Sequence, residues 1–454
     1  MTGTIYYKRY ANPHNQIVVG EGVYNETIDF DGKNLTIQSS NPDDSAVVAA
    51  TIINGGSEGL VVMFSGGEDA NCALAGLTVT GGKTGIYCSN TSSPVIENCV
   101  IDQEGKIAIE SGRSSNPEIL NCTIIGDIIT REVTNLNTAQ SYDYIQHAVN
   151  EAITGDQIVI GRGTYYENVD FKGKNLTVRS TEPNNSDIVA STIIKGGNQV
   201  ITFASGEDAN CVLAGLTITG GNRGIYCNSS APRIASCVIA ENKAEGIYAY
   251  KGNLELTNCI IADNSGAGLT AEANSKLSIT NCTIVANRGS GIKSTASTAT
   301  IVNSVLWSNL PAQITRLLST ITVNYSDIQG GWSGGQGNIN VDPCFADSNS
   351  SDYHLKSQAG RWDTNEKRWT KDDLTSLCID GGDPNSDWTA ELWPNGRRIN
   401  MGSYGGTPEA SMSLSTIGNI ADLNHDDAVD WLDFALFADS ERALTGYCLI
   451  TLAG

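Results

Sequence analysis

The chain has 454 residues, of which 40% are hydrophobic and 17% charged, so it is long enough for roughly two or three domains with a large buried core. Its formal charge of −22 argues against a nucleic-acid partner, because nucleic-acid binding needs a basic surface. Its apolar runs are too short to span a membrane, and residues 1–15 lack the apolar core of a signal peptide.

The first part of the chain is nearly repeated in its middle. GEDANCALAGLTVTGG at 67–82 recurs as GEDANCVLAGLTITGG at 206–221, and residues 16–126 as a whole duplicate roughly 157–260. A repeated block of this kind predicts two tandem copies of one architecture. The first copy lacks a helix ahead of its first repeat, so its N-terminal end is a candidate edge for self-association, unless residues 4–10 fold over it.

Between the two copies, residues 139–156 have a different periodicity. Apolar residues follow one another at helical spacing, and Gly155 ends the pattern. The apolar positions are Ile145, Ala148, Val149, Ala152 and Ile153. We predict a helix that covers the first turn of the second copy, because an exposed strand edge and an open core need a cap.

The second copy shows the shorter repeat clearly. From Cys237, the equivalent position recurs at Cys259, Cys282 and Ser304, in steps of 22, 23 and 22 residues. Asn precedes Cys in four repeats, and a second Asn series follows. The two series are Asn98, Asn121, Asn258 and Asn281, and then Asn242, Asn264, Asn287 and Asn309. Between them, short apolar-polar alternations predict strands, and Asn suits the bends because it tolerates the left-handed conformation.

This pattern resembles the right-handed parallel β-helix of pectin-lyase-like proteins. The resemblance covers about residues 16–345 and implies three parallel sheets with an Asn ladder at one bend. The predicted fold class is therefore all-β: a duplicated right-handed parallel β-helix solenoid with a small C-terminal helical calcium-loop segment. The resemblance implies little about chemistry, because the fold hosts lyases, hydrolases, esterases, adhesins and inert proteins.

We predict four segments. They are a first β-helix block at 1–134, a cap helix with the second block at 135–345, a closing segment at 346–411, and a linker with a partial dockerin-like segment at 412–454. The recurring Cys residues are interpreted as buried packing, although disulfides between turns are sterically possible. Cys344 and Cys378 lie outside the repeats and are a candidate disulfide if the protein is exported.

The tail contains a calcium-type motif, DLNHDDAVDWLD at 422–433. Its oxygen ligands stand at loop positions 1, 3, 5, 7, 9 and 12, and they are Asp422, Asn424, Asp426, the Ala428 carbonyl, Asp430 and Asp433. The segment resembles a dockerin repeat, which implies Ca²⁺ and a cohesin-like partner module. It departs from that pattern because Asp427 replaces the expected Gly, and because no second repeat follows Ala443.

Catalytic signatures are scarce. No GxSxG or HExxH motif occurs, and the four His residues are scattered. Glu241 and Asp263 are one period apart, so they are expected to stack about 5 Å apart on adjacent turns, as paired glycosidase acids do. Lys243 is a weak candidate base beside them. The competing interpretation of Glu241, Asp263 and Lys243 is a solvated turn. The duplicated GEDAN is interpreted as a turn, and the alternative is a cation site.

These observations favour a secreted or cell-surface β-helix protein that binds or processes polysaccharide and has a dockerin-like Ca²⁺-binding tail. If it is an enzyme, the expected class is a polysaccharide lyase or a glycoside hydrolase. The alternative is a non-enzymatic structural or adhesive surface protein that self-associates through its solenoid ends. The sequence does not separate these two hypotheses, because its periodicity predicts the coil but not what the coil binds.

Overall fold

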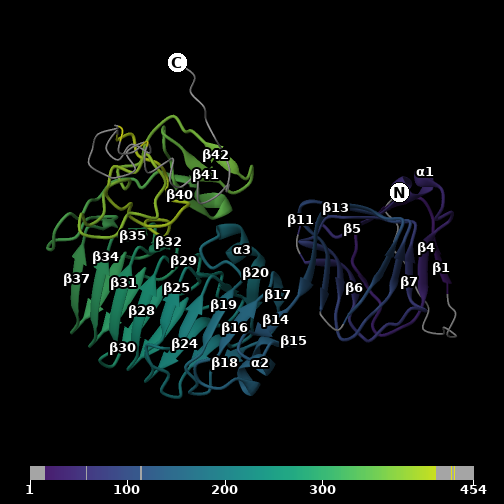
Figure 1. Cartoon of the computed structure of the whole chain (residues 1–454), viewed down its shortest axis with the longest axis horizontal. Helices are drawn as coiled ribbons and strands as arrows, with labels where there is room; N and C mark the ends of the chain where they lie inside the picture. The colour runs from purple at the N-terminus through teal and green to yellow at the C-terminus, as the bar shows by residue number, and fades with distance from the viewer. Residues whose placement is uncertain (1–15, 58, 113–114, 416–430, 432–433, 435–454) are drawn as a thin grey trace. The chain divides into compact units, whose positions relative to one another are not determined.

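The computed structural model describes residues 16–57, 59–112, 115–415, 431 and 434 (Figure 1). The chain divides into two compact units, one formed by residues 1–165 with 191–193 and the other by 166–190 with 194–454. Each unit contains a coil of short parallel strands, and we call these the first coil and the second coil. The predicted cation-loop residues, Asp422 to Asp430 and Asp433, lie outside the described residues.

The first coil is built from strands β1 to β13. One sheet of five parallel strands has the order β1 (Gln16–Val19), β4 (Thr36–Ser39), β7 (Ala73–Ala75), β10 (Val95–Glu97) and β12 (Glu118–Leu120). The other faces form a continuous sheet of β2 (Gly22–Tyr24), β5 (Thr51–Asn54), β8 (Thr78–Thr80), β11 (Val100–Gly112), β9 (Thr84–Cys88), β6 (Leu60–Phe64) and β3 (Ile28–Asp29). Strand β13 (Thr123–Arg131) pairs with β11, whose register with β13 shifts between Asp102 and Ile109.

An antiparallel addition follows the first coil. Strand β14 (Val133–Asn135) pairs antiparallel with both β15 (Gln140–Tyr142) and β16 (Gln157–Ile160), and β17 (Gly163–Tyr165) comes next. The predicted helix is present as α2 (Ile145–Glu151), with Ile145, Ala148 and Val149 buried. The prediction that Ile153 belongs to the apolar face of this helix was wrong. Ile153 is 72% exposed, because the helix ends two residues earlier.

Two further helices were missed by the sequence reading. They occupy the same place in the two copies and are α1 (Ser45–Ala50) and α3 (Ser186–Ser191). Each has six residues, which is too short for a helical period to show in the sequence. Asp44 caps α1 by accepting a hydrogen bond from the Ala46 N–H, and Asn185 accepts from the Asp187 N–H at the start of α3.

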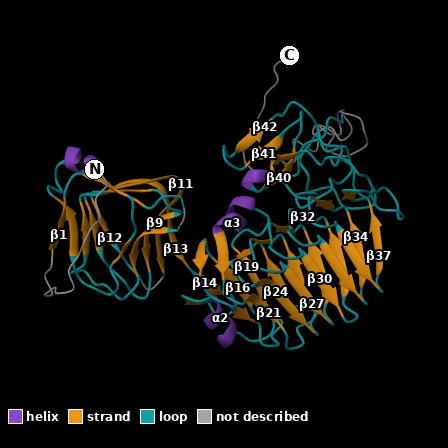
Figure 2. Ribbon diagram, turned by 180° about the vertical axis from the view of Figure 1, so that it is seen from behind, coloured by secondary structure: helices purple, strands orange, loops and turns teal. Residues whose placement is uncertain are grey.

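The second coil has three sheets of parallel strands, and Figure 2 shows its strands as stacked orange arrows. The first contains β19 (Thr177–Ser180), β22 (Val212–Ala214), β25 (Arg233–Ala235), β28 (Asn253–Thr257), β31 (Lys276–Thr280), β34 (Thr298–Val302) and β37 (Thr320–Asn324). The second contains β20 (Thr192–Lys195), β23 (Thr217–Thr219), β26 (Val238–Ala240), β29 (Ile260–Ala262), β32 (Thr283–Val285), β35 (Val305–Trp307) and β38 (Asp327–Ile328). The third contains β18 (Val169–Asp170), β21 (Gln199–Phe203), β24 (Arg223–Asn228), β27 (Ile247–Tyr250), β30 (Leu269–Glu272), β33 (Ile292–Thr295) and β36 (Ile314–Leu317).

The predicted Asn ladder is confirmed in the second coil. The Asn264 side chain accepts from the Asn242 N–H at 3.1 Å and donates to the Asn287 side chain at 2.9 Å, and Asn287 repeats the pattern with Asn309. These Asn side chains are buried, so the ladder satisfies amide groups that water cannot reach. The Asn residues of the Asn-Cys pairs play the other predicted role, because they adopt positive φ, for example 53° at Asn258.

A closing segment covers part of the second coil. It contains β39 (Phe345–Asp347), the 3-10 turn η1 (Ser348–Ser350), β40 (Asp352–Leu355), β41 (Arg361–Asp363) and β42 (Arg368–Thr370). Tyr353 packs in one cluster with Ile260 and Val285, so the closing segment lies on the outer face of the β20–β38 sheet. That this segment closes the second coil stays a prediction.

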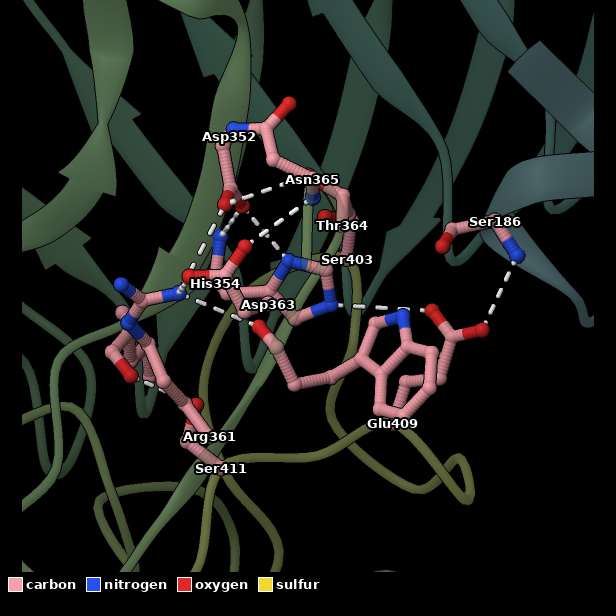
Figure 3. A network of polar contacts seen from close by, with 12 residues as sticks. Ser186, Asp352, His354, Arg361, Asp363, Thr364, Asn365, Ser403, Glu409 and Ser411 are labelled. Atoms are coloured by element: carbon pink, nitrogen blue, oxygen red, sulfur yellow. Dashed lines mark hydrogen bonds and ion pairs between the residues drawn. The ribbon is translucent and has the colours of Figure 1, made fainter. Parts of the chain in front are cut away.

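A buried histidine joins this segment to the coil (Figure 3). His354 Nδ1 lies 2.6 Å from Asp352 Oδ1, and its Nε2 lies 3.6 Å from Glu409 Oε2, while Tyr404 stacks on the ring. Glu409 in turn accepts from the Ser186 N–H at the start of α3. Burial alone would lower the pKa of His354, but the two carboxylates raise it above its usual value.

All eleven described Cys residues have free thiols, including Cys344 and Cys378, so the candidate disulfide between those two is not formed in this structure. Most of the recurring Cys side chains are fully buried, as the packing interpretation predicted. None of the helices in the described part of the chain is long and apolar enough to span a membrane.

Candidate functional site

The candidate acids Glu241 and Asp263 occupy the same bend of adjacent turns. Both have positive φ, 55° and 54°, and each directly precedes an Asn of the ladder. The Tyr353 hydroxyl of the closing segment donates to Asp263 Oδ2 at 3.2 Å. Burial, together with the charge of Glu241, raises the pKa of Asp263. Lys243 is exposed on the same bend, where its N–H bonds to the Gly221 carbonyl.

The Glu of the duplicated GEDAN motif is a structural lock. Glu68 is 1% exposed, and its carboxylate accepts hydrogen bonds from the Gly32 and Gly66 N–H groups and from the Ser92 hydroxyl. Burial alone would raise the pKa of Glu68, but these hydrogen bonds hold it below its usual value. Among the described residues, no group of three or more His, Cys, Asp and Glu side chains is placed to hold a metal ion.

The second copy repeats this lock. The buried Glu207 carboxylate accepts from the Gly173 N–H at 2.8 Å, from the Ser205 N–H at 3.0 Å and from the Ser230 hydroxyl at 2.7 Å. Each Glu therefore ties three successive turns of its coil together. The duplication that suggested a cation site is explained by this shared structural task.

The outer face of the β18–β36 sheet carries a tyrosine cluster, which we define as Tyr226, Tyr248 and Tyr250. Tyr226 and Tyr248 are partners in the parallel register of β24 and β27, and their rings stack with centroids 6.0 Å apart and an interplanar angle of 7°. Tyr250 is 37% exposed, and Lys251 Nζ lies 5.4 Å from its ring centroid. Partly exposed aromatic side chains gathered on one sheet face are a common feature of binding surfaces.

Charged groups fix the tyrosine cluster in place. The Arg223 guanidinium lies 4.0 Å from the Tyr248 ring centroid and forms an ion pair of 3.0 Å with Glu245. The Tyr248 hydroxyl donates to Glu272 at 2.8 Å. Burial and this hydrogen bond raise the pKa of Tyr248 to about 12, so the phenol stays protonated at neutral pH. Arg223, Glu245 and Glu272 thus hold the rings of this aromatic surface.

A shallow groove lies on the neighbouring β19–β37 sheet, beyond the bend at Lys251 and Gly252. Its volume is about 390 Å³, and its lining includes Asn253, Glu255, Lys276, Ser278, Thr298 and Thr300. Glu255 is the one carboxylate among the lining residues, and it is already paired with Arg233 at 3.1 Å. Hydroxyl, amide and ammonium groups from three successive turns therefore line the groove in register.

The sequence reasoning missed the tyrosine cluster. The signal was available, because the runs GIYCN at 224–228 and GIYAY at 246–250 place Tyr at the same repeat position in adjacent turns. The repeat alone indicates a strand at these positions. Which side of that strand faces water depends on the register and the packing of the coil.

Comparison with known proteins agrees with the architecture. Residues 150–276 and 177–328 match the family model described as "Right handed beta helix region". A "Cell surface glycoprotein" of Methanothermus fervidus is 33% identical over 113 residues, which cover 24% of this chain and 17% of that protein.

Two solved structures share a low similarity. The A-module of the Azotobacter vinelandii mannuronan C-5 epimerase AlgE6 matches with a TM-score of 0.25 and 10% identity, covering 72% of this chain and 91% of that one. The PL6 family alginate lyase AlyGC matches with a TM-score of 0.23 and 13% identity, covering 85% and 57%. Both TM-scores are low, and neither likeness bears on what this chain binds. By fold, the chain is a duplicated right-handed parallel β-helix.

Proposed function

We propose that the protein works outside the cell and binds polysaccharide on the second coil, through the tyrosine cluster and the adjoining groove. A sugar ring has an apolar C–H face and a rim of hydroxyl groups, so it suits a surface that offers aromatic rings beside charged and hydroxyl side chains. The observation that carries the proposal is the stacking of Tyr226 and Tyr248 in register, with Arg223 and Glu272 bonded around them. The partial match to a cell-surface glycoprotein supports the extracellular setting.

Local charge supports the same surface. Between Arg223 and Lys293 the sequence has seven basic and five acidic side chains, whereas the whole chain has 28 and 50. This part of the second coil therefore carries a small net positive charge in an acidic protein. A hydroxyl-rich or weakly acidic glycan meets less repulsion there than elsewhere on the surface.

The geometry favours binding over cleavage. Glycosidic cleavage by paired acids needs two carboxyl groups that face a common substrate position. The groove supplies one, Glu255, which is neutralised by Arg233. Asp263 is hydrogen-bonded to Tyr353 of the closing segment, so the bend that holds Glu241 and Asp263 is partly occupied by the protein itself.

The test is affinity electrophoresis and calorimetry of the full chain against a panel of neutral and acidic polysaccharides. We expect at least one glycan to bind, and we expect the double variant Tyr226→Ala/Tyr248→Ala to weaken that binding by tenfold or more. Tyr166→Ala is the matched control, because Tyr166 is 52% exposed on the same unit but lies outside the cluster. Equal binding by both variants would overturn the assignment of the site, and release of reducing ends would overturn the non-catalytic interpretation.

We also propose that the tail binds Ca²⁺ through a loop formed by Asp422, Asn424, Asp426, Ala428, Asp430 and Asp433. The candidate partner of this loop is a cohesin-like module. The support is the ligand spacing in the sequence alone. Calorimetric titration with Ca²⁺ should show one site that Asp422→Ala abolishes. Asp427→Gly should tighten binding, because position 6 of the loop needs a sharp turn. If Ca²⁺ binds equally to the Asp422→Ala variant, the loop is not the site.

One observation favours the alternative of a self-associating surface protein. Strand β36 is the last of its sheet, and in the described structure no strand pairs with its far edge. Exposed apolar side chains surround it: Leu310, Leu317 and Leu318 are 64%, 62% and 85% exposed. Such an edge is a template for strand pairing between copies. Sedimentation across a concentration series should then show oligomers that Leu317→Lys disperses, and a strict monomer at all concentrations would exclude this function.

A further inference from the structure

Two columns of cysteine side chains run along the coils. In the first coil, Cys99 and Cys122 stand opposite one another on adjacent turns, next to the register pair Val100 and Thr123. In the second coil, Cys237, Cys259 and Cys282 form a column of three, next to the register pairs that join β26, β29 and β32. Adjacent turns are about 4.8 Å apart, which falls within the Cα separation of disulfides, about 4.4–6.8 Å.

The columns differ in their access to solvent and in their freedom to adjust. Strand β12, which precedes Cys122, is the last strand of its sheet, so it has a hydrogen-bonded neighbouring strand on one side only. Cys122 is half-buried, and its Sγ accepts a hydrogen bond of 3.4 Å from the Cys99 N–H. By contrast, the three thiols of the second column are at most 1% exposed, and Cys259 lies between two neighbours in a continuous ladder.

We propose that Cys99 and Cys122 form a disulfide between turns when the protein is in an oxidising compartment, whereas Cys237, Cys259 and Cys282 stay reduced. The bond would staple the last turn of the first coil to the turn before it. This inference does not depend on polysaccharide binding, because the cysteines lie in the other unit. It depends on the register, the contact and the difference in exposure.

The chemistry is thiol–disulfide exchange with a small disulfide such as oxidised glutathione. The Cys122 thiolate attacks one sulfur of the reagent, which forms a mixed disulfide and releases one glutathione thiolate. The Cys99 sulfur then attacks Cys122 Sγ, which forms the protein disulfide and releases the second glutathione, and the Cys99 proton leaves with it. Two protein thiols are oxidised and one reagent disulfide is reduced to two thiols, so atoms and electrons balance.

The acidity of the thiols is consistent with this order of attack. The hydrogen bond from the Cys99 thiol lowers the pKa of Cys122, which favours Cys122 as the attacking thiolate. That same contact and burial hold the pKa of Cys99 well above its usual value. In the second column, burial alone would raise the pKa of Cys259, but the contact with Cys282 likewise lowers it, so burial and not thiol acidity distinguishes the two columns.

The experiment is peptide mapping by mass spectrometry under non-reducing conditions. The full chain is incubated with oxidised glutathione at pH 7.5, alkylated and digested. We expect a cross-linked peptide joining Cys99 to Cys122, with alkylated Cys237, Cys259 and Cys282. Cys122→Ser should abolish the cross-link, and Cys282→Ser should leave it unchanged as the matched control.

The other outcomes contradict the proposal. Glutathione that stays attached to Cys122 without resolution would show that the sulfurs cannot reach bonding distance. A cross-link within the second column would show that burial does not protect it. As a second readout, oxidation should slow amide hydrogen exchange in the β12 peptide of the native protein and not in the Cys122→Ser variant, and equal exchange in both would also overturn it.

Discussion

The two coils begin from nearly the same sequence but differ in the hydrogen bonding of the side chains at the same bend. Their shared start is visible in the core, where Phe30 stacks on Phe64 in the first coil and Phe171 contacts Phe203 in the second, at centroid distances of 4.2 and 4.5 Å. After this shared start, the second coil continues through a ladder of hydrogen-bonded Asn side chains, and from β18 onward each of its three sheets has seven strands. The first coil has five strands on its regular sheet, and among its described residues no such ladder of Asn side chains forms.

The residue at the ladder position explains the difference. In the second coil, the Asn242 side chain lies beside Gly224, and Gln103 lies in the same position beside Gly85 in the first coil. Gln103 is 2% exposed, and neither atom of its amide has a hydrogen-bond partner among the described residues. The Asn side chains bond to carbonyl groups of the preceding turn, whereas in the described structure the Gln103 amide bonds to none. The core therefore forms alike in both coils, while the side chain at the bend determines whether a hydrogen-bonded ladder joins successive turns.

Breaking the ladder should have the largest effect. Asn264→Ala removes an acceptor used by the Asn242 N–H and side chain, and a donor to Ile239 O and Asn287. Buried groups left without partners cost about 1–3 kcal/mol each, so we expect a loss of about 4 kcal/mol. Urea unfolding followed by Trp fluorescence measures it, because all seven Trp lie at position 307 or later and report on the second unit. The exposed Asn222→Ala is the control, and a loss below about 1 kcal/mol would contradict the role of the ladder.

The closing segment, which the first coil lacks, should add a pH dependence. Burial raises the pKa of Glu391 from 4.5 to about 8, so between these values the folded state binds a proton that the unfolded state releases. The stabilising effect is complete below pH 4.5 and is lost as pH rises toward 8, which amounts to about 2–3 kcal/mol between pH 5 and 7. Asp327, with its pKa raised to about 6, has the same sign.

Glu391→Gln isolates this effect. The Gln oxygen can still accept from the Asn400 and Gly406 N–H groups, which Glu391 Oε1 does at 2.8 Å each. We expect the variant to lose less stability than the parent between pH 5 and 7 in urea titrations read by Trp fluorescence. Parallel curves for the two proteins would show that the buried carboxyl does not retain its proton.

The shared Glu lock should behave alike in both coils. Glu68→Ala and Glu207→Ala each strip partners from two backbone N–H groups and one Ser hydroxyl, so each should cost about 2 kcal/mol. Hydrogen exchange of the peptides around 62–70 and 201–209 measures the two sites separately. A large effect in one coil and none in the other would show that the duplicated motif has diverged in role.

The smallest effect is a gain. Gln103→Leu replaces a buried, unsatisfied amide by an apolar side chain of similar size, which should stabilise the first coil by about 1 kcal/mol. Hydrogen exchange in β11 should slow accordingly. Destabilisation instead would mean that the amide of Gln103 finds partners in solution, and the contrast with Asn242 would then be weaker than the geometry indicates.

Much of the architecture was predictable because it is periodic. The Asn and Cys positions recur every 22 or 23 residues, and each position meets its own equivalent on the next turn, so local sequence and long-range contact carry the same information. The short helices α1 and α3, and the exposure of Ile153, were not predictable, because they depend on where single, non-repeated segments pack. The roles of Cys122 and Gln103 also needed the structure, since the half-buried state of Cys122 and the unpaired amide of Gln103 depend on contacts between turns.

The sequence by itself determined the coil, its duplication, the bends and the spacing of a Ca²⁺-type loop, because each is a repeat or a fixed local pattern of side chains. Only the tertiary structure decided that the GEDAN carboxylates are locks, that Tyr226 and Tyr248 form an aromatic surface with Arg223, and that Asp263 is bonded to Tyr353. The physical reason is that a side chain's role depends on which groups reach it and whether water does. Those contacts come from turns and segments that lie up to 90 residues apart in the chain.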